Sequence, residues 1–136
     1  MKKKFILLAA ILTIALVILT GCGNKNNVSM IDSMKKAAKD AGYAINDDYI
    51  GKSNENIAAG FTVLYPSEDG DINVPIYEFK DEDAANAYAK WLNDDGYQLA
   101  IVNGKYLTMV SVDDKGAVQN ENEKAFLEDL INGRKL

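Results

Sequence analysis

The sequence predicts an α+β domain, a two-layer antiparallel sheet of 4-5 strands with helices on one face, in the order α-(β)-β-β-α-β-β-α. Three observations predict this class. Three stretches carry apolar residues at helical spacing, four stretches alternate as strands do, and the strands come in pairs joined by short turn sequences. Strand pairs closed by tight turns form antiparallel sheets, and helices between such pairs pack on a face of the sheet.

The first predicted helix spans 29–41. It begins at Ser29, because Ser29 and Asp32 have the spacing of a capping box with aspartate in place of glutamate. Its apolar stripe consists of Val28, Ile31, Met34, Ala38 and Ala41. Gly42 suits the left-handed conformation that ends a helix, and 43–45 is the optional short strand.

Two strands are expected at 58–65 and 72–79, on either side of a turn of composition Pro-Ser-Glu-Asp-Gly. Phe61, Val63 and Tyr65 would share one face of the first strand. Pro75 interrupts the second strand. Because proline donates no hydrogen bond to a ladder, it predicts an edge strand or a bulge there.

The second helix is expected over 80–96, with Asp81 as its N-cap and Gly96 as its end. Its predicted apolar stripe is Ala84, Ala85, Tyr88, Trp91 and Leu92. The third helix begins after Asn120, whose spacing to Glu123 is that of a cap, and it ends at Gly133. Its apolar stripe is Phe126, Leu127, Leu130 and Ile131.

Between these helices, 97–112 reads as a hairpin around Asn103-Gly104, a strong signal for a two-residue turn. That turn would pair Val102 with Lys105 and Ile101 with Tyr106. One face would carry Tyr97, Leu99, Ile101, Tyr106, Thr108, Val110 and Val112, and the other Gln98, Ala100, Val102, Lys105, Leu107, Met109 and Ser111.

The second face of this hairpin holds the candidate interaction patch, which consists of Ala100, Val102, Leu107 and Met109. If the last two helices cover the Tyr97–Val112 face, a two-layer fold leaves this patch exposed. Exposed apolar patches of several hundred Å² mark interaction surfaces, so the patch would bind a protein partner or a second copy in a homodimer. The alternative is that the first helix or a long loop covers it as a third layer.

The first 22 residues predict where in the cell the protein is located. Three lysines follow Met1, then an apolar run from Phe5 to Thr20, then Leu19-Thr20-Gly21-Cys22. These are the parts of a secretory signal peptide. An uncleaved transmembrane anchor is the alternative, but 16 mostly apolar residues fall short of the roughly 20 that span a bilayer.

The last four of these residues resemble the lipobox of bacterial lipoproteins, and the chain resembles the small lipoproteins of low-GC bacteria. That resemblance implies cleavage between Gly21 and Cys22 and a lipid anchor on Cys22, at the extracytoplasmic face of the cell membrane. The domain organisation is then a signal peptide at 1-21, a polar linker at 22-28 and a single α+β domain at 29-136.

Composition excludes several kinds of chemistry. The chain has no histidine and a single cysteine, which excludes Ser-His-Asp and Cys-His catalysis and zinc sites built on imidazole. Cleavage at Cys22 would remove three of 15 basic residues and none of the 20 acidic ones, leaving a net charge of −8. An acidic domain does not suit nucleic acid.

We therefore expect a non-enzymatic interaction module for a protein partner, without catalytic residues, cofactor or metal. The alternative is a lipoprotein that binds cell-wall glycan or a small ligand, through Trp91 and the tyrosines. A carboxylate-dependent hydrolase is a more distant alternative, since the separation of two carboxylates in space cannot be read from sequence. Glu68, Asp69 and Asp71 offer oxygen ligands for calcium but lack the EF-hand pattern.

Overall fold

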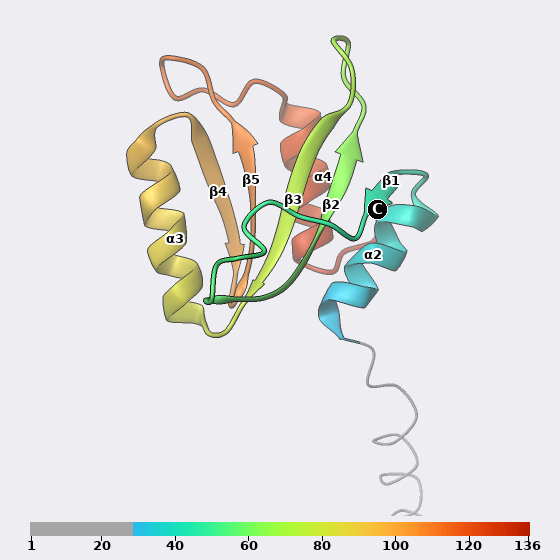
Figure 1. Cartoon of the computed structure of the whole chain (residues 1–136). Coiled ribbons are helices and arrows are strands. Elements are labelled where there is room, and N and C mark those ends of the chain that lie inside the picture. The colour runs from blue at the N-terminus through green and yellow to red at the C-terminus, as the bar shows by residue number, and fades with distance from the viewer. Residues whose placement is uncertain (1–28) are drawn as a thin grey trace, which may run out of the picture.

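The computed structural model describes residues 29–136, which form a five-stranded sheet and three helices (Figure 1). The strands are β1 Ala44–Asn46, β2 Ile57–Tyr65, β3 Ile72–Phe79, β4 Gln98–Asn103 and β5 Tyr106–Ser111, and the helices are α2 Met30–Asp40, α3 Glu82–Asp95 and α4 Glu121–Ile131. The strand order is β1-β2-β3-β5-β4, and all neighbours are antiparallel. Across 29–136, no helix is both long and apolar enough to cross a membrane.

The predicted class and element order are confirmed, and the helix ends are where the capping residues place them. The Asp32 amide donates to Ser29 Oγ (3.1 Å), and the Ala84 amide donates to Asp81 Oδ1 (2.8 Å). Gly96 ends α3 in the left-handed region, with φ of 81°. Local hydrogen-bonding chemistry therefore sets these boundaries.

The predicted hairpin register is wrong by two residues. Val102 pairs with Leu107 rather than Lys105, because the two turn residues are Gly104 and Lys105. Gly104 has φ of +58° and occupies the first turn position, where type II′ turns require glycine. Since a shift of two preserves the alternation of side chains, every residue of the hairpin keeps its predicted face.

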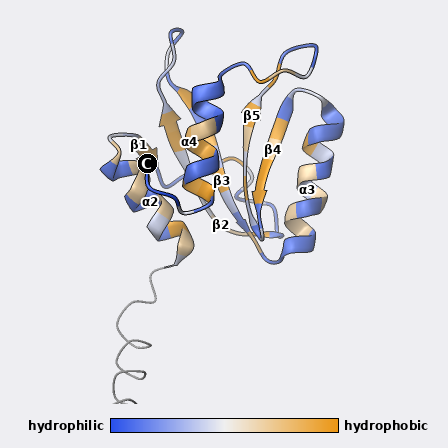
Figure 2. Cartoon of the chain, turned by 180° about the vertical axis from the view of Figure 1, so that it is seen from behind, coloured by the Kyte–Doolittle hydropathy of each residue, from blue (hydrophilic) through white to orange (hydrophobic). Residues whose placement is uncertain are grey.

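The helices lie on both faces of the sheet, so the predicted arrangement with helices on one face is wrong. In Figure 1, α4 lies behind the sheet and the segment 47–56 crosses in front of it. Figure 2 shows the rear face, where α2 and α4 lie over the sheet. Their buried residues pack with Phe61, Val63 and Ile76. Ala85, Ala89 and Leu92 of α3 belong to a second cluster on the opposite face.

The candidate interaction patch belongs to this second cluster. Leu107 is completely buried and Met109 is 7% exposed, whereas Ala100 and Val102 are half-buried and pack at the edge of the cluster. The cause is α3, whose Ala85 and Ala89 let the helix approach the strands closely. The expectation of an exposed patch is therefore corrected: these residues form core. They are covered by α3 rather than by the first helix, and Tyr49 of the long loop 47–56 packs against the same cluster.

Pro75 lies in a central strand, not at the edge that its missing amide donor predicted. The paired residues of β3 and β5 are Tyr77 with Leu107 and Glu78 with Tyr106, so the ladder does not extend to Pro75. Instead, Thr108 Oγ1 donates to the Pro75 carbonyl (2.9 Å). In an antiparallel ladder the amide and the carbonyl of a residue face the same neighbouring strand. The carbonyl of Pro75 faces β5, so its missing amide donor also faces β5, at a point where β3 and β5 are no longer paired.

Replacing Thr108 by valine should therefore destabilise the fold. Valine has nearly the same shape but cannot donate to the Pro75 carbonyl, and Thr108 is fully buried. We expect a loss of about 1–3 kcal/mol in the free energy of unfolding, measured by equilibrium urea denaturation. Ser111→Ala, an exposed change on the same strand, is the control and should stay within about 0.5 kcal/mol. Equal losses in both variants would contradict the assigned hydrogen bond.

Candidate functional site

The four residues of the candidate patch lie side by side, since Val102 pairs with Leu107 and Ala100 with Met109, but they belong to the core rather than to an open surface. Gly21 and Cys22 lie outside the described residues. Of the candidate patch, Leu107 and Met109 are buried under α3. The surface features available to a partner therefore lie elsewhere: the segment over the front of the sheet, an exposed tryptophan on α3, and a hollow at the start of α4.

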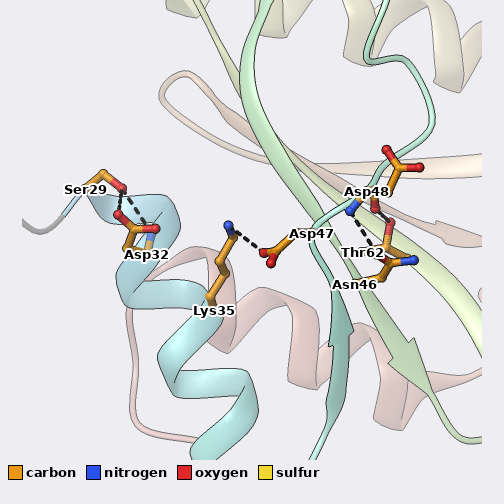
Figure 3. Close-up of polar contacts among 7 residues, drawn as sticks. All are labelled: Ser29, Asp32, Lys35, Asn46, Asp47, Asp48 and Thr62. Carbon is orange, nitrogen blue, oxygen red and sulfur yellow. Dashed lines mark hydrogen bonds and ion pairs between the residues drawn. The ribbon is translucent and has the colours of Figure 1, made fainter.

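The segment 47–56 is fixed to the helix and the sheet at its beginning (Figure 3). Lys35 Nζ pairs with Asp47 Oδ1 at 2.9 Å, and the Asp48 amide donates to Asn46 Oδ1 at 3.0 Å. Thr62 Oγ1, from β2, donates to the Asp48 carbonyl at 2.8 Å. The segment is thus bound to α2 through Asp47 and to the sheet through the carbonyl of Asp48.

Tyr77 fixes the next part of the same segment. Its hydroxyl donates to the Ile50 carbonyl at 2.5 Å, and burial raises its pKa to about 12, with smaller contributions from Tyr88 and Tyr49. The phenol therefore remains a proton donor at every physiological pH. The Tyr77 ring also meets the edges of the Tyr49 and Tyr88 rings, both at 6.0 Å between centroids. Tyr77 is therefore a structural residue that holds the segment 47–56 against the sheet.

Trp91 extends this aromatic series to the surface. It was predicted to lie in the buried stripe of its helix, yet it is 60% exposed, and Ala85, Ala89 and Leu92 are the buried residues of α3. Its ring lies 5.4 Å from that of Tyr88, at 44°. Because the buried side of α3 is narrow, with only Ala85, Ala89 and Leu92 fully buried, the indole sits at its margin. Trp91 is available for contact with another molecule.

A hollow of about 690 Å³ lies between the β2–β3 turn and the start of α4, and we call it the α4 hollow. It is lined by Tyr65, Pro66, Ser67, Glu68, Asp69, Ile72, Ser111, Gln119, Asn120, Asn122 and Glu123. Three of these residues are acidic and none is basic. In Figure 1 the β2–β3 turn and the start of α4 lie at the upper end of the molecule, whereas α2 begins at the lower end.

Glu123 is the unusual residue of the α4 hollow, because it is a charged residue that is only 5% exposed. Its amide donates to Asn120 Oδ1 (3.1 Å), as the predicted cap requires. Among the described residues, however, no hydrogen bond or ion pair reaches its carboxylate, which lines the hollow instead. Burial raises the pKa of this carboxyl group above its ordinary value of 4.5. The sequence signal was its spacing: Glu123, Phe126, Leu127 and Leu130 share one helix face.

The Glu123→Gln variant should be more stable than the natural chain at pH 7. A carboxyl whose pKa is raised by folding binds protons more tightly in the folded state, so its ionisation destabilises the fold as pH rises. The advantage of the variant should shrink as pH falls through the pKa of Glu123, and vanish below the pKa of the unfolded chain. Urea denaturation between pH 7 and 3 measures this. A variant less stable than the natural chain at pH 7 would show that the carboxylate has an undetected partner.

A second, smaller hollow of about 230 Å³ lies beside the segment 47–56, lined by Asn46, Asp48, Tyr49, Ile50, Thr62, Asn73 and Pro75. Its acidic residue is already paired, since Lys52 Nζ lies 3.2 Å from Asp48 Oδ1. It therefore lacks the uncompensated charge of the α4 hollow. Comparisons with protein-family models, with curated proteins and with solved structures find no match to this chain.

Proposed function

We propose that this chain is a membrane-anchored, extracytoplasmic lipoprotein that acts as a non-enzymatic interaction module for a protein partner. The observation that carries the proposal is the sequence Leu19-Thr20-Gly21-Cys22 after a basic start and an apolar run. A thioether-linked diacylglycerol on Cys22 would hold the chain at the membrane, and a second acyl chain would make the attachment stable. The absence of histidine from the sequence supports a binding role over catalysis.

The placement of the α4 hollow supports a role in binding. The helix that the linker precedes, α2, begins at the lower end of the molecule in Figure 1, and the α4 hollow lies at the upper end. An anchor at Cys22 would therefore leave the hollow facing away from the membrane. Residues 23–29 span at most about 24 Å when fully extended, which keeps the domain close to the bilayer.

Mass spectrometry of the chain purified from cell membranes tests the anchor. We expect a mature form that begins at Cys22, lacks residues 1–21 and carries acyl chains on that cysteine. A form that retains Met1, or one with a free thiol at Cys22, would contradict the lipoprotein. Chemical cross-linking in intact cells, followed by purification in detergent, should then yield a defined protein partner in stoichiometric amount. Recovery of the chain without any partner would contradict the interaction module.

A cell-wall glycan is the second candidate, and the exposure of Trp91 favours it. Aromatic rings with an apolar face and a wet edge stack on sugars, and Trp91 adjoins Tyr88 at the surface of α3. If glycan is the ligand, Trp91→Ala should reduce co-sedimentation with purified peptidoglycan, while Glu121→Gln, an exposed change elsewhere, should not. Co-sedimentation that is equal in the variant and the natural chain would exclude this route.

A further inference from the structure

The α4 hollow has the charge of a site for cations. Glu68 and Asp69 come from the β2–β3 turn and Glu123 comes from the first turn of α4, so the acidic groups lie on opposite sides of the space. Tyr65 forms part of the wall, and burial raises its pKa, with smaller contributions from Tyr43 and Glu123. The hydroxyl of Tyr65 is therefore neutral. Within 29–136, no lysine or arginine lines the hollow to neutralise the three carboxylates.

The state of Glu123 points to a ligand more directly. Glu123 is 5% exposed as a whole residue, and its carboxylate has no hydrogen-bonding or charged partner among the described residues, so its oxygens reach solvent at the hollow that the residue lines. Burial of the rest of the residue still disfavours the charge, because no protein group offsets the partial desolvation. The nearest basic residue along the helix, Lys124, pairs with Glu128 at 2.9 Å. The first turn of α4 gives only partial compensation through the helix dipole. A cation in the hollow would supply the missing partner.

We propose that the α4 hollow binds the ammonium or guanidinium group of a lysine or arginine side chain presented by a polypeptide partner, with Glu123 as its counter-charge. This inference rests on the proposed function and names the chemistry of the partner. Among residues 29–136, no three acidic or other metal-binding side chains are grouped closely enough to hold a metal ion. Ammonium and guanidinium groups do not need such convergence, because they donate to one carboxylate and to surrounding amide oxygens.

The amide groups of the hollow suit this role. Gln119 uses its Nε2 to donate to the Val112 carbonyl (3.2 Å), which leaves its carbonyl oxygen as an acceptor. Asn120 Oδ1 accepts hydrogen bonds from the backbone amides of Asn122 and Glu123, which fixes this side chain as the helix cap. The hollow is also large enough, at about 690 Å³, for a long basic side chain and part of its backbone. Binding should weaken on acidification, as Glu123 takes up a proton.

The test uses the full chain in non-ionic detergent micelles and the peptide acetyl-Gly-Arg-Gly-amide as probe, followed by amide chemical shifts in NMR titrations. We expect saturable shifts at Ser67, Asn120 and Glu123. Glu123→Gln should raise the dissociation constant about tenfold, the equivalent of losing one charge-assisted hydrogen bond. Glu121→Gln removes the same charge from the same helical turn, outside the lining of the hollow, and should change binding less than twofold.

Three outcomes would overturn the inference: no saturable shifts at the hollow, equal weakening by Glu121→Gln and Glu123→Gln, or binding of free agmatine as tight as that of the peptide. The last would assign the hollow to a small amine. The proposed function fails separately, through the mass of the cellular form or the lack of a cross-linked partner. If a partner is captured equally by the natural chain and Glu123→Gln, the interaction module stands and this site for it is wrong.

Discussion

Replacing Leu107 by lysine should abolish folding at 25 °C. Leu107 is completely buried on the face that α3 covers, in the cluster with Tyr77 and Phe79. An ammonium group there would have no described acidic partner. The free-energy cost of burying an unpaired charge exceeds the roughly 4–5 kcal/mol above which a destabilising substitution is exceptional. Since small domains have a total stability of about 5–15 kcal/mol, we expect circular dichroism and urea denaturation to report a largely unfolded chain.

Two further variants make this prediction discriminating. Leu107→Ala should lose about 2–5 kcal/mol and still fold, because it removes apolar contacts without introducing a charge. Ile50→Lys is the matched control: the same kind of change at a side chain that is 76% exposed should alter stability by no more than about 0.5 kcal/mol. A Leu107→Lys chain that folds normally would mean that this face is exposed after all and would restore the predicted interaction patch.

The sequence predicts local features of this fold better than the placement of its helices. Caps such as Ser29 and Asp81 act through bonds to residues three positions away, so they can be read directly. The side of the sheet that α3 takes depends on the path of its connections, which no local pattern encodes. One signal was present: 107–110 reads Leu-Thr-Met-Val, with no charged residue in alternation. Such a run is typical of a strand that is buried on both faces.

The α4 hollow illustrates the same limit for a site. The capping role of Asn120 and the helix face shared by Glu123 and Phe126 can be predicted from spacing alone. The hollow itself requires the β2–β3 turn, about 55 residues earlier, to lie beside that helix end. Whether a carboxylate at the first turn is solvated or buried depends on this long-range contact. Its unpaired state was therefore beyond prediction from the sequence.

Replacing Gly60 by alanine should destabilise the domain and loosen the segment 47–56. A Cβ atom at position 60 would lie 2.8 Å from the Ile76 carbonyl oxygen and 3.1 Å from the Tyr49 ring. The first obstacle is the backbone of the adjacent strand, since Gly60 pairs with Tyr77 in the β2–β3 ladder. The second is the ring that covers the front of the sheet. Overpacking of this kind costs about 1–3 kcal/mol, and we expect a loss at the upper end of that range.

A double-mutant cycle separates the two obstacles. If the Tyr49 ring causes most of the strain, Gly60→Ala should cost much less in a Tyr49→Ala background, and the coupling energy between the two sites should exceed about 0.5 kcal/mol. If the Ile76 carbonyl causes it, the cost should be the same in both backgrounds, because the strands cannot separate without breaking the ladder. Hydrogen exchange of the amides in 47–56 gives an independent measurement, and faster exchange in Gly60→Ala is expected. A variant as stable as the natural chain, with unchanged exchange, would contradict both the close approach of the Ile76 carbonyl and that of the Tyr49 ring.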